Sequence, residues 1–503
     1  MPFKLLHRLN SHVENQGERN AFFINNTSFS YISFMKRIRA IQQEILENSG
    51  EDELFYGLVT FDDLDTYAAI YALWYLGKAY VPLNPANPAD RNRSILEQTD
   101  IKSILFSAEK AKEPGFTTGM NLIYTSELPD SEKDVKEVDV PDESPCYMIF
   151  TSGSTGKPKG VPITRANLGS FVEHFAAAGY DMGPDDRFLQ IYDLSFDASV
   201  HCYTLPLWTG GCVYTVPRDQ IKYLYAYKLM KEQQLTFVKM PPSTLAYLQP
   251  YFNSIRLEHL RYCLLGGEAF NTDLALKWSE CVPNAQIQNV YGPTEATINT
   301  HIFNWSKEQN EGKSYNGVVS IGKCFGENEA VIIDEKEGLL GPHEKGELCL
   351  GGRQVTPAYW RNDEQNERAF IQLEVNGQKK RFYRTGDLAF TDCDGDFMFL
   401  GRIDSQVQIQ GYRVELGEVE KHSRDALGIL NVAAIARINA SSITEIILFV
   451  ESTEARISFL QNYLEERLPS YMLPARIIPV EVFPKSVGGK ISRSALEKLI
   501  ADE

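Results

Sequence analysis

The sequence lacks the cysteine spacing that structural zinc sites and redox motifs require. Its 503 residues include eight cysteines, and no two of them are separated by just two residues. Most lie in apolar runs such as YCLL at 262–265, where free thiols behave as small buried hydrophobic groups. We therefore expect buried free cysteines and a reducing compartment.

The sequence also lacks an excess of positive charge and a long apolar run. Its net charge is -17, which argues against nonspecific binding to nucleic acid and against docking on anionic lipid. The most apolar stretch, 67–83, is interrupted by Gly77 and Lys78 and is shorter than the roughly 18–20 residues that span a bilayer. The N-terminus, MPFKLLHRLN, has no apolar segment of a signal peptide. We expect a cytoplasmic protein without membrane insertion.

Apolar patterning predicts an α/β protein with more than one domain. A chain of this length exceeds a single hydrophobic core. Residues 29–48 have apolar side chains at helical spacing after a serine, which predicts an amphipathic helix. Strands are expected at 54–61, 79–82, 101–106, 147–150, 187–191, 212–215, 236–239 and 262–265, alternating with helices such as 66–76 and 165–178. After about residue 320, short strands at 330–333, 346–350 and 396–400 predict a β-rich unit, followed by an α+β tail.

The stretch IFTSGSTGKPKG at 149–160 is rich in hydroxyl residues, glycines and lysines. Free backbone N–H groups, hydroxyls and a lysine together can surround phosphate oxygens, which predicts a loop that binds a polyphosphate. The loop is not a Walker motif, because Gly156 and Lys157 are followed by Pro158 instead of Ser or Thr. Taken alone, the stretch is also compatible with a Ser/Gly-rich linker.

Further segments follow this loop in a fixed order. They are SFDAS at 195–199, NVYGPTEA at 289–296, GELCLGG at 346–352, YRTGDL at 383–388, GRIDSQVQIQGYRVELGEVE at 401–420 and PKSVGGKISR at 484–493. With the loop, they strongly resemble the adenylate-forming superfamily, which includes acyl-CoA synthetases, luciferases and the adenylation domains of nonribosomal peptide synthetases. The motifs cover nearly the whole chain, so the resemblance removes the linker interpretation.

The resemblance implies both an architecture and a reaction. It implies a large N-terminal AMP-binding domain, 1–403, of layered α/β sheets with a small distorted β-barrel. A small α+β C-terminal domain, 404–503, would be mobile about a hinge at Asp404. The implied reaction uses ATP and Mg²⁺ to convert a carboxylate into an acyl adenylate and pyrophosphate, and then transfers the acyl group to a thiol.

The resemblance also implies the residues that bind the nucleotide. They are Thr151, Ser152, Gly153, Ser154, Thr155, Gly156, Lys157, Asn289, Val290, Tyr291, Gly292, Pro293, Thr294, Asp387, Phe399 and Arg402. Tyr291 would lie along the adenine and Thr294 near the α-phosphate, while Asp387 and Arg402 would contact the ribose. Glu295 would be a catalytic carboxylate that binds Mg²⁺, a cation that prefers oxygen ligands.

Lys490, in the stretch GGKIS, resembles the catalytic lysine of the superfamily. Attack of a carboxylate on the α-phosphate brings two anions together. A lysine that reaches both can hold them in line and offset the developing charge. After the hinge turns, residues 410–413 would face the path of the incoming thiol.

Asp197 divides the superfamily, because amino-acid-activating members have an aspartate at this position that pairs with the α-ammonium group of the substrate. A buried aspartate without a cationic partner is costly, so its presence favours an amino acid over an acid without an amine. The resemblance places the substrate pocket at Asp197, Ala198, His201, Lys239, Leu264, Gly266, Val290, Ile298, Asn299 and Lys490.

Lys239 and Gly266 bear on the side chain of the amino acid. Together they resemble pockets for aspartate or asparagine, although a lysine with its amine in water at the end of a strand is an open alternative. The chain length most resembles stand-alone D-alanine–carrier protein ligases. That group usually has Cys-Gly-Glu where this chain has Gly266-Gly267-Glu268, so D-alanine stays open.

No carrier domain follows the motif of Lys490 before Glu503, so we expect a separate phosphopantetheinylated carrier protein as acceptor, or coenzyme A. Two other functions are compatible with parts of the sequence. An acyl-CoA synthetase would act on acids without an amine, against which Asp197 argues. A catalytically inactive nucleotide-binding scaffold is disfavoured because Glu295, Asp387 and Lys490 are all present.

Overall fold

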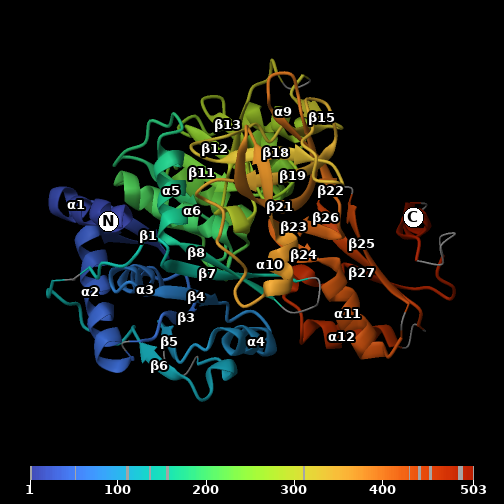
Figure 1. The fold of residues 1–503 in the computed structure, drawn as a ribbon. Coiled ribbons are helices and arrows are strands. Elements are labelled where there is room, and N and C mark those ends of the chain that lie inside the picture. Colours follow the sequence, from blue (N-terminus) through green and yellow to red (C-terminus); the bar gives the residue numbers. More distant parts are fainter. Residues whose placement is uncertain are drawn as a thin grey trace.

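The computed structural model describes residues 3–50, 52–108, 113–134, 137–153, 158–309, 312–429, 431–439, 443–452, 456–484 and 491–501. Across these ranges, each helix falls short of the length or the apolar character that crossing a bilayer requires. Figure 1 shows the N-terminal three quarters of the chain as layered sheets and helices, with the C-terminal elements packed against one side.

The largest sheet is mainly parallel and belongs to the N-terminal part. Its order is β17 (Lys323–Cys324), β14 (His301–Trp305), β13 (Gln286–Tyr291), β12 (Tyr262–Gly266), β11 (Phe237–Met240), β9 (Arg187–Gln190), β10 (Cys212–Thr215), β1 (Asn20–Ile24) and β2 (Thr27–Ser30). The central strands pair in parallel, whereas β2, β14 and β17 are antiparallel to their neighbours. The carboxyl ends of the central strands therefore share one edge.

A second sheet repeats this arrangement. Its order is β6 (Asn121–Tyr124), β5 (Ser103–Phe106), β3 (Phe55–Val59), β4 (Ala79–Leu83), β7 (Pro145–Thr151) and β8 (Lys159–Thr164). Only β8 runs antiparallel to its neighbour among these described strands. The predicted strands are confirmed, with shifts of a few residues at their ends.

Helices cover and separate the two sheets. They are α1 (Lys4–Gln16), α2 (Tyr31–Asn48), α3 (Leu64–Tyr75), α4 (Ala89–Thr99), α5 (Arg165–Ala176), α6 (Asp197–Thr209), α7 (Lys222–Glu232), α8 (Pro242–Leu248) and α9 (Thr272–Cys281). One apolar core contains side chains of both sheets and of α2, α3, α5 and α6. All of α3 except Asp65 is buried, which explains the apolar run at 67–83 as a core helix followed by a buried strand.

Local sequence fixes where the predicted helices begin. The Ser30 side chain accepts a hydrogen bond from the backbone N–H of Ser33, so the helix predicted over 29–48 begins at Tyr31. Its buried side chains include Phe34, Ile38 and Ile41, at helical spacing. A reciprocal cap between Thr164 and Asn167 starts α5 in the same manner.

A β-rich unit follows, as predicted. It pairs β18 (Glu329–Ile333), β19 (Gly346–Gly351), β21 (Gln378–Thr391) and β20 (Phe370–Val375), and β22 (Phe397–Arg402) also pairs with β21. Helix α10 (Asp363–Ala369) and the short pair β15 (Ser314–Tyr315) and β16 (Val318–Val319) lie beside it. Cys393, in the turn after β21, is exposed, so the expectation of buried cysteines is wrong at this position.

The C-terminal elements form a hairpin and a small α+β unit. They are β23 (Gln406–Ile409), β24 (Tyr412–Glu415), α11 (Leu416–Leu427), β25 (Val432–Ile438), β26 (Thr444–Val450), α12 (Ile457–Glu465), β27 (Arg476–Pro479) and α13 (Arg493–Ala501). Their apolar clusters contain only residues from Val407 onward. Asp404 lies in the link between β22 and β23, and its role as the domain boundary stays a prediction.

Candidate active site

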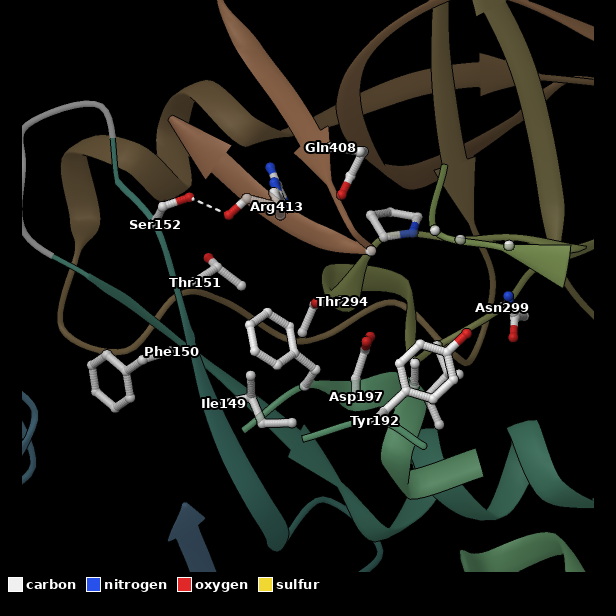
Figure 2. A pocket seen from close by; sticks show the side chains of 18 of the residues that line it. Ile149, Phe150, Thr151, Ser152, Tyr192, Asp197, Thr294, Asn299, Gln408 and Arg413 are labelled. Carbon is white, nitrogen blue, oxygen red and sulfur yellow. Dashed lines mark hydrogen bonds between the residues drawn. The ribbon is translucent and has the colours of Figure 1, made fainter. Parts of the chain in front are cut away.

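A cavity lies at the carboxyl ends of strands from both large sheets. Thr151, Lys239 and Gly266 line it from the ends of β7, β11 and β12. Gln408 and Arg413 reach it from the C-terminal hairpin, on the side opposite the sheets (Figure 2). Ligands of α/β proteins bind outside the carboxyl ends of parallel strands, so this cavity is the candidate active site.

Asp197, the first residue of α6, faces the cavity. The residue is half-buried, yet its Oδ2 atom is enclosed and has no hydrogen-bond partner among the described residues. Burial raises the pKa of Asp197, whereas the charge of Lys239 and a hydrogen bond with Thr294 lower it. An enclosed carboxylate oxygen without a donor is costly unless a ligand supplies one. The position suits an ammonium group.

Lys239 is buried, with 3% of its surface exposed, so the alternative of a solvated lysine is wrong. Its Nζ donates to Asn299 Oδ1 at 2.6 Å and lies 3.4 Å from His201 Nδ1. Burial lowers the pKa of Lys239 to about 8, although Cys202 and Asp197 act in the opposite direction. Burial and the charge of Lys239 also hold the pKa of His201 well below its usual value, so that ring is neutral.

The cavity wall therefore presents a carboxylate and an amine that are not engaged in ion pairs. In the parts of the chain that the structure describes, no carboxylate oxygen lies within 4.0 Å of the Lys239 amine. Ala198, Ile298 and Asn299 complete this part of the wall. The two unpaired charges suit a ligand with charges of its own.

Tyr291, Asp387 and Arg402 form a hydrogen-bonded group beside the cavity. The Tyr291 hydroxyl donates to Asp387 Oδ2 at 2.5 Å, and Arg402 donates to Asp387 Oδ1 at 2.8 Å. Arg402 also donates to both carboxylate oxygens of Asp404, at 2.7 Å each. Burial raises the pKa of Asp387, and the Arg402 charge and the Tyr291 hydroxyl lower it. The predicted ribose acceptor is thus linked through Arg402 to the predicted hinge.

Glu295 is fully buried and carries its charge at neutral pH. Arg413 donates to both carboxylate oxygens, at 2.9 and 2.8 Å, and the Tyr359 hydroxyl donates to Oε1 at 2.6 Å. Burial alone would raise the pKa of Glu295, but the charges of Arg413 and Lys159 outweigh it and hold the pKa at about 2. A permanently ionised carboxylate is a good ligand for Mg²⁺, so Glu295 fits the predicted metal once Arg413 withdraws.

The loop predicted to bind phosphate is described only in part. Thr151 and Ser152 line the cavity, and the enclosed Thr151 Oγ1 has no partner among the described residues. Gly153 follows directly. Ser154, Thr155, Gly156, Lys157 and Lys490 lie outside the described residues.

Comparison with known proteins identifies the family. A model described as "AMP-binding enzyme" matches residues 9–360. The chain belongs to the AMP-binding enzyme family. Its sequence is 30% identical over 504 residues to tyrocidine synthase 1 of Brevibacillus parabrevis, a match covering 98% of this chain and 45% of that protein. The chain spans less than half the length of the curated relatives it matches.

Solved structures of AMP-binding enzymes confirm the predicted fold class. The Vibrio cholerae adenylation domain AlmE, in complex with glycyl-adenosine-5'-phosphate, gives a TM-score of 0.86 at 23% identity, covering 100% of this chain and 98% of that chain. The o-succinylbenzoate CoA synthetase MenE of Bacillus subtilis gives 0.84 at 20% identity, covering 99% and 98%. The family model and the sequence relatives confirm the predicted resemblance to the adenylate-forming superfamily.

Some predicted residues do not line the cavity. Val290 and Leu264 belong to the apolar core, and Phe399 packs against it from β22. The Asn289 side chain donates to the carbonyls of Val319 and Ser320. Leu264 pairs with Lys239 and Val290 pairs with Gly266, so these two residues share a sheet face with the cavity wall without lining the cavity themselves. Gly292, Pro293 and Thr294, which follow β13, do line the cavity.

The loop after Thr294 is held by a residue that the sequence motifs did not indicate. Thr297 and Ile298 have positive φ angles of 55° and 74°, a backbone conformation that is strained for β-branched residues. Gln354 is 0% exposed, so water does not reach it. Its side-chain amide donates a hydrogen bond to the backbone carbonyl of Asn299 at 2.7 Å. The backbone carbonyl of Gln354 also accepts a hydrogen bond from the Thr297 hydroxyl at 2.6 Å. We call Gln354 the brace of this turn. The sequence could not predict it, because the positive φ angles that the brace supports leave no sequence pattern.

A second, larger cavity of about 560 Å³ adjoins the first. Tyr192, Phe196, Gly411 and Tyr471 line both. The rings of Tyr412 and Tyr471 stack at 4.2 Å between centroids. The two cavities therefore share a wall between the N-terminal sheets and the C-terminal hairpin.

Proposed function

We propose that the protein activates an amino acid with ATP and then loads it on the phosphopantetheine thiol of a separate carrier protein. In the first step the substrate carboxylate attacks the α-phosphorus of ATP, and pyrophosphate leaves. In the second step the thiol attacks the acyl carbon, and AMP leaves. A long thiol arm would enter through the second cavity, which lies between the sheets and the hairpin and adjoins the first.

The enclosed, unpartnered Oδ2 atom of Asp197 carries this proposal. A substrate ammonium group would supply the missing donors and a compensating charge. An acid without an amine would leave this oxygen without a partner in the filled pocket, at a cost of about 1–3 kcal/mol. The glycyl adenylate bound by AlmE is an aminoacyl adenylate in a protein of the same fold, which is consistent with this chemistry.

We further propose that the amino acid has an acidic or amide side chain, with aspartate favoured over asparagine. The buried amine of Lys239 has a neutral amide and a neutral imidazole as its nearest hydrogen-bonding partners. A substrate carboxylate there would form a charge-assisted hydrogen bond, which is about twice as strong as one between neutral groups. Such a side chain also offsets the charge whose burial lowers the pKa of Lys239.

The nucleotide would use the remaining polar groups around the cavity. Thr151 and Thr294 offer hydroxyls near the predicted phosphate position, and Asp387 offers acceptors for the ribose hydroxyls. Glu295 would hold Mg²⁺, which would neutralise phosphate charge when bound. Lys490 would stabilise the charge that develops during adenylate formation.

D-alanine is less well supported as the substrate. A Cβ atom on Gly266 would lie 2.4 Å from the carbonyl oxygen of Val290. The cysteine that D-alanine ligases usually have at this position would therefore force β12 and β13 apart. A small apolar side chain would also leave Lys239 without an anion.

Pyrophosphate exchange tests the proposal directly. Each L- and D-amino acid is supplied with ATP and labelled pyrophosphate, beside succinate, the amine-free analogue of aspartate. We expect exchange with L-aspartate, weaker exchange with asparagine and little with succinate. Asp197→Asn, which keeps the side-chain size, should abolish the preference for aspartate over succinate.

Other outcomes would replace the proposal. Exchange with succinate alone would contradict the role of Asp197 and indicate an acyl-CoA synthetase. Exchange with D-alanine would indicate a D-alanine ligase. For the second step, radiolabelled aspartate should appear on a phosphopantetheinylated carrier protein and not on its unmodified form; transfer to coenzyme A alone would refute the carrier.

A further inference from the structure

A buried carboxylate needs a cation beside it, and Glu295 has Arg413. The Glu295 side chain is 0% exposed and that of Arg413 is 15% exposed. The two residues are 118 positions apart in sequence, and Arg413 comes from strand β24 of the C-terminal hairpin. The cation that hydrogen-bonds with Glu295 is therefore supplied by an element outside the N-terminal sheets.

The geometry leaves no free oxygen on Glu295. One guanidinium nitrogen, Nη1, lies within 2.9 Å of both oxygens, and the Tyr359 hydroxyl adds a third donor at Oε1. A magnesium ion binds carboxylate oxygens at 2.0–2.1 Å and needs near-octahedral space around it. A guanidinium in this place would occupy that space and repel the ion. The amine of Lys159 lies 4.9 Å from the centre of the Tyr359 ring and adds further positive charge.

We propose that Arg413 and the divalent cation replace one another at Glu295. The hairpin β23–β24 can dock on the active site only when the metal is absent from Glu295, and binding of the metal with nucleotide releases the hairpin. Arg413 is thus a positioning residue that makes the location of the C-terminal hairpin depend on the metal. The inference rests on the proposed role of Glu295 as the magnesium ligand, but not on the identity of the amino acid or the thiol.

Other contacts hold the hairpin without involving the metal ligand. The Gly411 N–H donates to Glu268 Oε1 at 2.7 Å, and the Ser152 hydroxyl donates to the carbonyl of Arg413 at 2.9 Å (Figure 2). Lys222 Nζ donates to the Tyr412 hydroxyl at 3.3 Å. These bonds are compatible with either occupant of the carboxylate. Only the guanidinium of Arg413 competes for Glu295, so it alone should make docking sensitive to metal.

The exchange would order the two steps of the reaction. While metal and pyrophosphate remain, the carboxylate is engaged and the hairpin stays away. After they leave, Glu295 would be an uncompensated buried charge, which is strongly unfavourable. Arg413 then neutralises Glu295. The docked hairpin lines the second cavity, through which the thiol would approach.

Docking can be measured by energy transfer in the full-length protein without any turnover. One dye is placed on exposed Cys393 and the other on a cysteine introduced by Lys498→Cys on exposed α13. A non-hydrolysable ATP analogue is added with EDTA or with Mg²⁺. For the wild type we expect the added Mg²⁺ to lower the docked fraction severalfold beyond the effect of nucleotide alone.

Variants at the interface separate the roles. In Arg413→Gln the hairpin should dock less, and Mg²⁺ should have no further effect on docking. Mn²⁺ added with the analogue should bind at least about tenfold more tightly than to the wild type, as measured by paramagnetic resonance, because no buried ion pair has to be broken. Lys222→Gln, which removes a hydrogen bond from the same hairpin, should weaken docking but keep the response to Mg²⁺. Arg413→Lys keeps the charge and should keep a weaker response.

Two results would overturn the proposal. One is a wild-type hairpin whose docking is indifferent to Mg²⁺. The other is an undiminished Mg²⁺ response in Arg413→Gln, or in Arg413→Lys if the glutamine variant fails to fold. Since neither amino acid nor thiol is present, a wrong substrate assignment would leave these results unchanged.

Discussion

Replacing Lys239 by methionine removes the buried amine while nearly conserving side-chain length. In the wild type this amine lies 2.6 Å from Asn299 Oδ1 and has its pKa lowered from 10.5 to about 8. The substitution should therefore act in opposite directions on stability and on substrate binding. That opposition makes it a stringent test.

The effect on stability follows from the pKa. A lowering from 10.5 to about 8 corresponds to about 3 kcal/mol of unfavourable burial of the charged form. The penalty is fully present below pH 8 and disappears as the pH rises toward the unfolded value. Lost hydrogen bonding to Asn299 offsets about 1–2 kcal/mol. We expect Lys239→Met to be more stable than the wild type by about 1–2 kcal/mol at pH 7, with the difference shrinking between pH 8 and 10.

The effect on substrate binding has the opposite sign. Removing one partner of a buried ion pair costs about 3–5 kcal/mol, so kcat/KM for aspartate should fall by about 10²-fold or more. Activation of an amino acid with an apolar side chain of similar size should fall far less.

Pyrophosphate exchange and urea unfolding on the same preparations provide the two readouts. Lys277→Met, on the exposed face of α9, is the matched control and should change neither. An unaltered amino acid profile in Lys239→Met would refute the assignment of this amine to the substrate side chain. A loss of stability at pH 7 would refute the electrostatic argument.

Three further predictions follow from the site. Because only protonated Lys239 attracts an anion, KM for aspartate should rise about tenfold per pH unit above about pH 8. In Lys239→Arg, KM should not change with pH until the substrate amine titrates. A wild-type KM that is independent of pH would contradict the assignment. Gln354→Leu leaves buried carbonyls of the 296–299 turn without donors, so we expect a loss of about 2–3 kcal/mol in urea unfolding and a lower kcat/KM; unchanged unfolding would refute the brace. Gly266→Cys should lower the melting temperature because of its contact with Val290 and should not create exchange with D-alanine; a stable variant that activates D-alanine would show that β12 and β13 separate readily.

Much of the fold could be predicted because several of its central strands are largely apolar. FYGLV in β3 and YCLLG in β12 have no charged or amide residue and are buried on both faces, as parallel strands between helices are. Short strands whose pairing depends on distant partners were less visible. The first strand, Asn20–Ile24, pairs with β10, almost two hundred residues further along the chain.

The candidate site could be predicted from motifs but not its electrostatics. A lysine after an apolar strand is equally compatible with solvent and with burial, so the sequence left Lys239 open. Its burial comes from His201 on α6 and Asn299 on the turn after Glu295, and contacts between separate elements leave no local pattern. The pairing of Arg413 with Glu295 was missed for the same reason.

The apolar core that both large sheets share has a consequence for how the site responds to perturbation. Side chains of α3 and α6 fill the space between the sheets, so neither sheet can shift without opening voids in a close-packed interior. We therefore expect the separation between Thr151 on one sheet and Lys239 on the other to change little when ligands bind. We therefore expect adaptation to successive ligands to come from the C-terminal elements, whose apolar clusters are separate from the shared core. Large-to-small substitutions in the core near α3 should therefore reduce the discrimination between substrates, even though no residue of the pocket is changed.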